Sequence, residues 1–141
     1  MKYFLYLITV TFFFSCKEPK IETSTSTEEK ENFDTFFKKF SSDSIFQKQR
    51  IIFPFKMTYW ESELETPNIE YYDTTNYSFL NFEYNPSFSK REIDAYTQEI
   101  KIYHDTVRLE IRGIDNGIYI DTDFIIVKGL WYCSHFNDSS T

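Results

Sequence analysis

The chain has 141 residues, a length that favours one folded domain, and its 15 basic and 22 acidic side chains give a net charge of −7. It contains 16 phenylalanines and 11 tyrosines but only 3 glycines and 4 prolines, which excludes collagen-like, linker-like and wholly disordered proteins. The acidic balance argues against nucleic acid as a partner, because phosphate binding needs clustered lysines and arginines. No phosphate-binding loop, dinucleotide-binding fingerprint or zinc-ligand spacing is present, so neither a cofactor nor a metal is predicted.

The N-terminus has the features of a secretion signal. Lys2 is followed by an apolar stretch over residues 3–14, and Ser15 and Cys16 come directly after it. A helix of that length rises about 18 Å, short of the ~30 Å hydrocarbon core that a spanning helix crosses. An apolar segment, a small residue and a cysteine resemble the lipobox of bacterial lipoproteins, although Phe13 stands where that motif usually has leucine.

The lipobox resemblance implies that residues 1–15 form a signal peptide and that Cys16 is acylated and becomes the mature N-terminus. Two or more acyl chains give stable membrane anchoring, whereas one gives marginal binding. We therefore expect a lipid-anchored protein of the cell envelope, on the periplasmic or cell-surface face and most simply of the outer membrane. Two alternatives are a secreted protein cleaved elsewhere and an uncleaved anchor. Cys133 is the one other cysteine, so no intramolecular disulfide is expected.

A polar segment separates the expected anchor from the expected domain. Residues 16–31 begin with this cysteine. After it they contain Ile21 as the one sizeable apolar residue, together with a Ser/Thr run and several glutamates. Such a segment buries too little surface to offset the entropy lost on ordering, which predicts a flexible tether. A single domain is predicted over residues 32–138, with a short tail at 139–141.

Two short helices are predicted at the start of the domain. Four phenylalanines within residues 33–40 recur at helical spacing, and Asn32 precedes them as a candidate N-cap. A second helix is expected to begin at Ser44, with Gln47 at the spacing of a capping box. Its expected inward-facing residues are Ile45 and Phe46.

Extended segments follow the helices. Residues 51–60 read as a strand, which Pro54 favours at a sheet edge because proline cannot donate a ladder hydrogen bond. Residues 62–75 are polar and mixed, and are expected to be irregular. Alternating or β-rich patterns predict further strands joined by short turns, at 77–84, 95–104, 107–112, 118–127 and 130–136. The predicted fold class is α+β, with one or two N-terminal helices packed on a curved antiparallel sheet of about five or six strands.

Two stretches resemble known families. The segment FDTFFKKFSSDSIFQKQRIIFPF (33–55) resembles the opening of an uncharacterised lipoprotein family of Bacteroidetes, a domain of unknown function. The ending FIIVKGLWYCSHFND (124–138) resembles the last hairpin of nuclear transport factor 2-like folds. The first resemblance, carried by the spaced phenylalanines, implies a secreted lipoprotein with no assigned activity. The second implies a cone of helices on a curved sheet, a fold that hosts both enzymes and binding modules. The other matching residues of the first segment are Asp43, Phe46, Gln47, Arg50, Ile51, Phe53 and Pro54.

Arginine, tyrosine and tryptophan supply the candidate ligand-binding residues. Arg50 lies at the predicted helix-to-strand junction. There it has a structural role, capping helix carbonyls or pairing with an acid, or it binds an anion at the mouth of a pocket. The aromatic candidates surround the least regular part of the domain. Their flat apolar faces and polar groups suit stacking on sugars or anchoring a partner, and the alternative is that they fill the core. These aromatic candidates are Tyr59, Trp60, Tyr77 and Tyr84, with Tyr71 and Tyr72 in the same region.

Two residue pairs offer catalytic chemistry. Asp121 and Asp123 are expected on one strand face, where either acid beside a tyrosine would supply an acid/Tyr pair for proton transfer. Cys133 and His135 are also expected on one face, where a thiol beside an imidazole can act as nucleophile and base. The structural alternatives are a solvent-facing carboxylate pair and a buried cysteine. Alternating charges on another predicted strand suggest a cross-strand charge ladder, at Arg108, Glu110 and Arg112.

These features predict a membrane-tethered extracytoplasmic lipoprotein that acts as a non-enzymatic binding or interaction module. Its expected partners are the lipid bilayer, through Cys16, and a small molecule, glycan or envelope protein. One alternative is a small enzyme of the cone-shaped α+β class that uses an acid/Tyr proton-transfer pair. Another is a structural envelope protein whose sheet edge pairs with a second chain.

Substitution Cys16→Ser is expected to abolish acylation and move the protein from the membrane fraction to the soluble fraction. Ultracentrifugation of cell extracts and mass spectrometry of the N-terminal peptide measure both effects. Lys17→Ser, which leaves the acylated cysteine in place, serves as the matched control. Unchanged membrane partition of the Cys16→Ser protein would contradict a lipid anchor.

Overall fold

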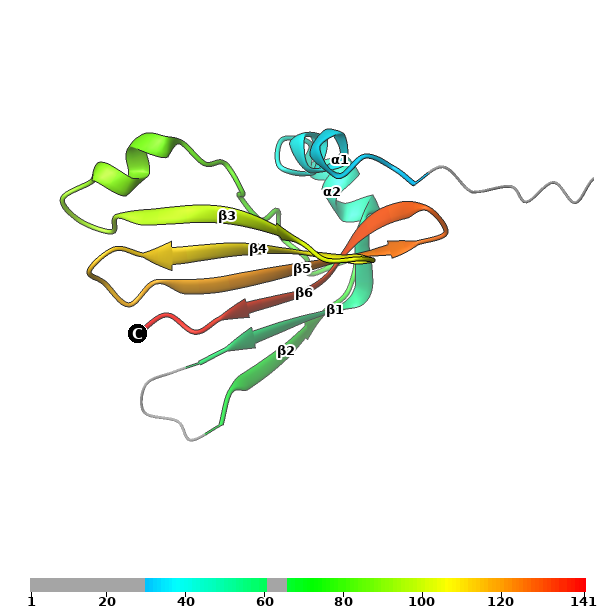
Figure 1. Ribbon diagram of the computed structural model, residues 1–141. Coiled ribbons are helices and arrows are strands. Elements are labelled where there is room, and N and C mark those ends of the chain that lie inside the picture. The colour runs from blue at the N-terminus through cyan, green and yellow to red at the C-terminus, as the bar shows by residue number, and fades with distance from the viewer. Residues whose placement is uncertain (1–29, 61–65) are drawn as a thin grey trace, which may run out of the picture.

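A computed structural model describes residues 30–60 and 66–141, which form two helices packed over one end of a six-stranded sheet (Figure 1). Within these residues no helix is long and apolar enough to cross a bilayer. Cys16 and the predicted signal peptide lie outside them. The elements are α1 (Phe33–Phe40), α2 (Ser44–Gln49), β1 (Ile51–Tyr59), β2 (Asn68–Tyr72), the 3-10 helix η1 (Pro86–Lys90), β3 (Tyr96–Ile102), β4 (Thr106–Gly113), β5 (Tyr119–Val127) and β6 (Leu130–Asp138).

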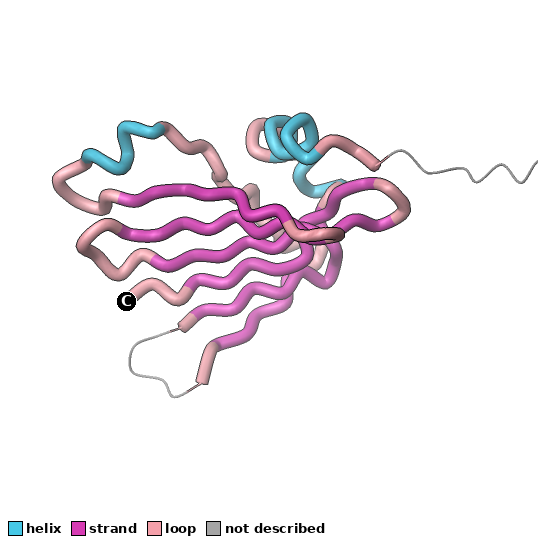
Figure 2. Tube along the Cα trace, viewed as in Figure 1, coloured by secondary structure: helices cyan, strands magenta, loops and turns pink. Residues whose placement is uncertain are grey.

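The sheet has the order β2-β1-β6-β5-β4-β3, and Figure 2 shows the strands side by side. Strands β3 to β6 form the predicted antiparallel meander, whereas β1 runs parallel to β6 and antiparallel to β2, so the sheet is mixed. The α+β architecture is confirmed. A parallel pair needs a long connection, and here β2, η1 and strands β3 to β5 lie between β1 and β6 in the chain.

The prediction that Pro54 places its strand at a sheet edge is wrong, because β1 lies between β2 and β6. The register of β1 against β6 shifts between Ile51 and Lys56, so Pro54 occupies the stretch where the regular ladder is interrupted. The expectation of an irregular segment over 62–75 is also wrong for β2; residues 61–65 lie outside the described part of the chain.

Helix α1 forms as predicted, since the side chain of Asn32 accepts a hydrogen bond from the backbone nitrogen of Thr35 (3.0 Å). The expected capping box of α2 is absent. Asp43 caps α2 instead, because its carboxylate accepts from two backbone nitrogens of the first turn. Ile45, expected to face inward, is 71% exposed, while Phe46 packs against the core as expected.

Gln47 holds residues 77–84 out of the sheet, so the strand predicted there does not form. Its fully buried amide donates to the carbonyls of Phe40 (3.0 Å) and Leu80 (2.8 Å), and its oxygen accepts from the Leu80 nitrogen (2.8 Å) and the Tyr77 hydroxyl. The glutamine side chain thus satisfies both backbone groups of Leu80, in the middle of the segment, as a neighbouring strand would. Phe82 is thereby directed into the core.

The hydrophobic core is built around Phe124 of β5, which has no exposed surface. Its ring meets Phe33, Phe36 and Phe40 of α1 at centroid distances of 5.4, 5.9 and 5.4 Å, in edge-to-face geometry. Phe82 of the 77–84 segment contacts the same ring at 6.4 Å. The phenylalanine spacing in the sequence thus marks the face of α1 that packs on the sheet.

Arg50 joins the helices to the sheet through Glu31. Its guanidinium donates to both carboxylate oxygens of Glu31 (2.9 and 3.0 Å) and to the carbonyl of Trp131 (3.0 Å). The Trp131 nitrogen also donates to Glu31 (2.9 Å), and the Trp131 indole donates to the Glu31 carbonyl (2.8 Å). Glu31, the last residue of the predicted tether, therefore packs with the domain.

Substitution Arg50→Met is expected to lower the free energy of unfolding by about 1–3 kcal/mol, because it leaves the partly buried Glu31 carboxylate without its cation. Urea denaturation monitored by tryptophan fluorescence measures the change. The double variant Glu31→Gln/Arg50→Met removes the uncompensated charge and should lose less stability than the single variant. An equal or greater loss in the double variant would contradict this account of the pair.

Candidate functional site

The ligand-binding candidates do not form one site. Arg50 is engaged by Glu31 with its side chain 14% exposed, so the anion-binding alternative for Arg50 lacks a free guanidinium. Tyr77 is bonded to Gln47 and packs edge-on against Phe53 and Phe55. Tyr84 packs instead against two aromatic rings of η1 and β3. Tyr59 and Trp60 are the two candidates that the fold brings together.

Tyr59 and Trp60 line a cavity of about 430 Å³. It lies beside the end of β1, which Figure 1 shows at the edge of the sheet away from the helices. The antiparallel register pairs Tyr59 of β1 with Asn68 of β2, and the parallel register places Asp138 of β6 beside Tyr59. Alternation along β2 then puts every second residue on the same face. We call this cavity the β1–β2 pocket, lined chiefly by Tyr59, Trp60, Asn68, Glu70, Tyr72 and Asp138.

Aromatic rings and carboxylates dominate the β1–β2 pocket. The Trp60 side chain is 42% exposed, and its backbone nitrogen donates to the carbonyl of Asp138 (2.8 Å). The Tyr72 hydroxyl donates to the carboxylate of Glu70, and the Tyr59 hydroxyl points at a methionine sulfur of the same strand (3.5 Å). The lining includes two acids and no basic side chain, so the pocket favours neutral or cationic ligands over anions.

Both tyrosines of the pocket remain protonated at neutral pH. The hydrogen bond to Glu70 raises the pKa of Tyr72 well above its usual value, and burial raises the pKa of Tyr59. A neutral phenol can donate and accept hydrogen bonds but is a poor base. The chemistry of the pocket is therefore that of hydrogen bonding and ring stacking.

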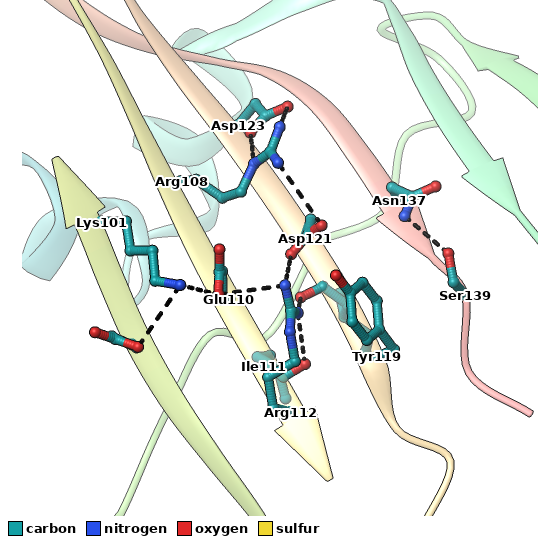
Figure 3. A network of polar contacts seen from close by, with 12 residues as sticks. Lys101, Arg108, Glu110, Ile111, Arg112, Tyr119, Asp121, Asp123, Asn137 and Ser139 are labelled. Atoms are coloured by element: carbon teal, nitrogen blue, oxygen red, sulfur yellow. Dashed lines mark hydrogen bonds and ion pairs between the residues drawn. The ribbon is translucent and has the colours of Figure 1, made fainter. Parts of the chain in front are cut away.

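Asp121 and Asp123 lie in a network of charges on the sheet face opposite the core (Figure 3). Arg108 donates to both oxygens of Asp123 (2.7 and 3.1 Å), and Arg112 donates to Asp121 (2.6 Å). Glu110 lies 3.3 Å from Arg112, and its hydrogen bond from a lysine of β3 lowers the Glu110 pKa. The predicted cross-strand charge ladder is confirmed, and it commits both aspartates to arginines.

The expectation that Cys133 and His135 share a face is wrong. Asp123 pairs with His135 while the next residue, Phe124, pairs with Cys133, so Ser134 is an extra residue that forms a β-bulge. The bulge turns Cys133 into the core and His135 onto the charged face. There the imidazole contacts the Thr58 hydroxyl at 2.9 Å, and burial lowers the pKa of His135.

Sequence reasoning found the aromatic residues of the β1–β2 pocket but missed its polar ones. Asn68 and Glu70 were missed because residues 62–75 were expected to be irregular, and Asp138 because the parallel pairing of β6 with β1 was not expected. The two-residue spacing of Asn68, Glu70 and Tyr72 is the signal that marks a strand with one polar face. Across residues 30–60 and 66–141, no three His, Cys, Asp or Glu side chains are placed to hold a metal ion.

Solved structures resemble this fold. A nuclear transport factor 2-like protein of Bacteroides fragilis aligns with a TM-score of 0.56 at 22% identity, over 80% of this chain and 49% of its own. A protein of Bacteroides uniformis aligns at 0.57 and 20% identity, over 77% of this chain and 76% of its own. A cystatin-like protein of Bacteroides caccae aligns at 0.53 and 21% identity, over 78% and 77%.

These similarities define the class of fold: an α+β domain like that of the nuclear transport factor 2-like protein of Bacteroides fragilis and the cystatin-like protein of Bacteroides caccae. The chain spans about half the length of the Bacteroides fragilis protein (49%). No protein-family model matches the chain, and no curated protein matches it. These similarities show the fold and no activity, because one fold hosts many functions. The function is therefore inferred from the β1–β2 pocket.

The thiol of Cys133 is expected to react with Ellman's reagent only as fast as the domain unfolds. It has no exposed surface, and burial raises its pKa, so little thiolate forms. In the Cys16→Ser protein, in which Cys133 is the one thiol, absorbance at neutral pH with and without urea measures the rate, and the urea sample gives the full thiol count as the control. Rapid reaction in the folded state would contradict an inert, buried cysteine.

Proposed function

We propose that this chain is a bacterial lipoprotein, anchored through Cys16, whose domain binds a hydroxyl-rich ligand such as a glycan unit in the β1–β2 pocket. The anchor is supported by the lipobox-like start of the chain and by the resemblance of residues 33–55 to the Bacteroidetes lipoprotein family. Acidic proteins gain nothing from anionic lipid surfaces, so the acyl chains alone hold the domain to the bilayer. The pocket then faces the extracytoplasmic space.

The combination of stacking surfaces and hydrogen-bonding groups in one pocket carries this proposal. Trp60 offers a half-exposed ring, and Tyr59 and Tyr72 add two more aromatic side chains. Sugars present C–H faces that pack on such rings and hydroxyls that bond to carboxylates, which Glu70 and Asp138 provide. The volume of about 430 Å³ lies within the usual range of small-ligand pockets, about 300–1,000 Å³.

An enzymatic function has one supporting observation, the hydrogen bond from Tyr72 to Glu70, because it is an acid/Tyr pair. The raised pKa of Tyr72 opposes its use as a base at neutral pH. Asp121 and Asp123, the other acids considered for such a role, are held by arginines on the opposite face. Binding is therefore the function that the pocket supports better.

A glycan array probed with the full chain, followed by calorimetry on the strongest hit, tests the proposal. Trp60→Ala and Tyr72→Phe are expected to weaken binding about tenfold each, since each removes a stacking or hydrogen-bonding contact worth about 1.4 kcal/mol. Tyr103→Ala, which removes an exposed tyrosine outside the pocket, should leave the affinity unchanged. The absence of any glycan hit, or equal losses in all three variants, would overturn the proposal.

A further inference from the structure

A second cavity, of about 630 Å³, lies at the opposite end of β1, beside α2. Helix α2 forms one wall through Ile45 and Lys48, and Phe79 of the 77–84 segment forms another. Ile51 and Phe53, the first residues of β1, also line it. We call this cavity the α2 groove. It shares no lining residue with the β1–β2 pocket.

The α2 groove exposes large apolar side chains. Ile45 is 71% exposed and Phe79 is 43% exposed, although both are attached to segments that pack firmly through Gln47. Ile51 is buried and Tyr77 is partly buried, so the cavity has an apolar base beneath these exposed residues. Exposed apolar residues gathered around a hollow are typical of a binding surface.

Lys48 is the one charged residue that lines the α2 groove. Across the described residues its ammonium has no ion pair. The nearby acid, Asp73, forms no ion pair with it. The Asp73 carboxylate accepts from the backbone nitrogen and the hydroxyl of Thr75 (both 2.6 Å) and from the Asn76 nitrogen (3.2 Å); these bonds lower the pKa of Asp73, and the positive charge of Lys48 adds a smaller effect. The apolar side chains of the α2 groove and the ammonium of Lys48 are together complementary to an aliphatic chain that ends in an anionic group.

We propose that the α2 groove binds a free aliphatic carboxylate, with its chain between Ile45 and Phe79 and its carboxylate at Lys48. The charge of this groove is opposite to that of the β1–β2 pocket, which has two acids and no base. A second copy of the chain is a less suitable occupant, because a stable protein interface buries about 1,200 Å² or more and needs a far wider surface. This site is independent of the proposed glycan function.

Calorimetry with three eight-carbon probes tests the assignment: octanoate, octylammonium and 1-octanol. The full chain is held in lipid nanodiscs, and empty nanodiscs give the blank for partitioning. Octanoate is expected to bind with one site per chain and more tightly than octylammonium. Lys48→Glu should weaken octanoate about tenfold and leave octanol unchanged, because it reverses the charge at the head alone.

Surface variants separate the apolar contribution from the charge. Ile45→Ser and Phe79→Ser should weaken both octanoate and octanol, and both remove exposed side chains, so the fold is retained. The matched controls are Ile93→Ser and Lys90→Glu, which change an equally exposed isoleucine and an exposed lysine elsewhere. Trp60→Ala should leave octanoate binding intact, which distinguishes this site from the β1–β2 pocket.

Four outcomes would overturn the assignment. They are no octanoate heat above the blank, equal affinity for octylammonium, an octanoate affinity unaffected by Lys48→Glu, and unchanged binding in Ile45→Ser. Analytical ultracentrifugation of the same samples tests the other occupant: a dimer that dissociates in Phe79→Ser would mean that a second copy covers the groove.

Discussion

The ion pair between Glu31 and Arg50 is the constraint on which the arrangement of this domain depends. Arg50 follows α2 and precedes β1, so its bonds to Glu31 and to the Trp131 carbonyl hold the end of α2 against β6. The same guanidinium lies near the rings of Phe36, Phe46 and Tyr132, at 5.8, 5.0 and 5.4 Å. A planar cation with several donors can satisfy a carboxylate, a carbonyl and aromatic faces together, which a lysine cannot do.

Strand β1 contributes lining residues to both candidate sites. Its first residues, Ile51 and Phe53, line the α2 groove, and its end, at Tyr59, lines the β1–β2 pocket. The parallel pairing of β1 with β6 brings Asp138 to the second site, and the ion pair at Arg50 positions α2 over the first. This interior strand thus lines the α2 groove at one end and the β1–β2 pocket at the other, and the charged residues of the two cavities have opposite signs.

Sequence periodicity within one segment predicted its structure correctly, whereas contacts between segments changed two of the predictions. The phenylalanines of α1 and the alternation of β4 were interpreted correctly, since each pattern reports a face that its own segment buries. The strand expected over 77–84 does not form, and Gln47, distant in sequence, bonds the backbone of Leu80 at its middle. The Cys133 and His135 pair failed because a single extra residue, Ser134, reverses which face the following side chains occupy.

From composition and periodicity alone one obtains an acidic, phenylalanine-rich α+β domain and the aromatic residues Tyr59, Trp60 and Tyr72. These follow because helix and strand periods are local and because apolar side chains must be buried. Only the folded chain reveals that β1 is an interior strand, that Glu70 and Asp138 meet those aromatics, and that Arg50 is occupied by Glu31. Each of these facts depends on strand register or on contacts between distant segments, and no local period encodes them.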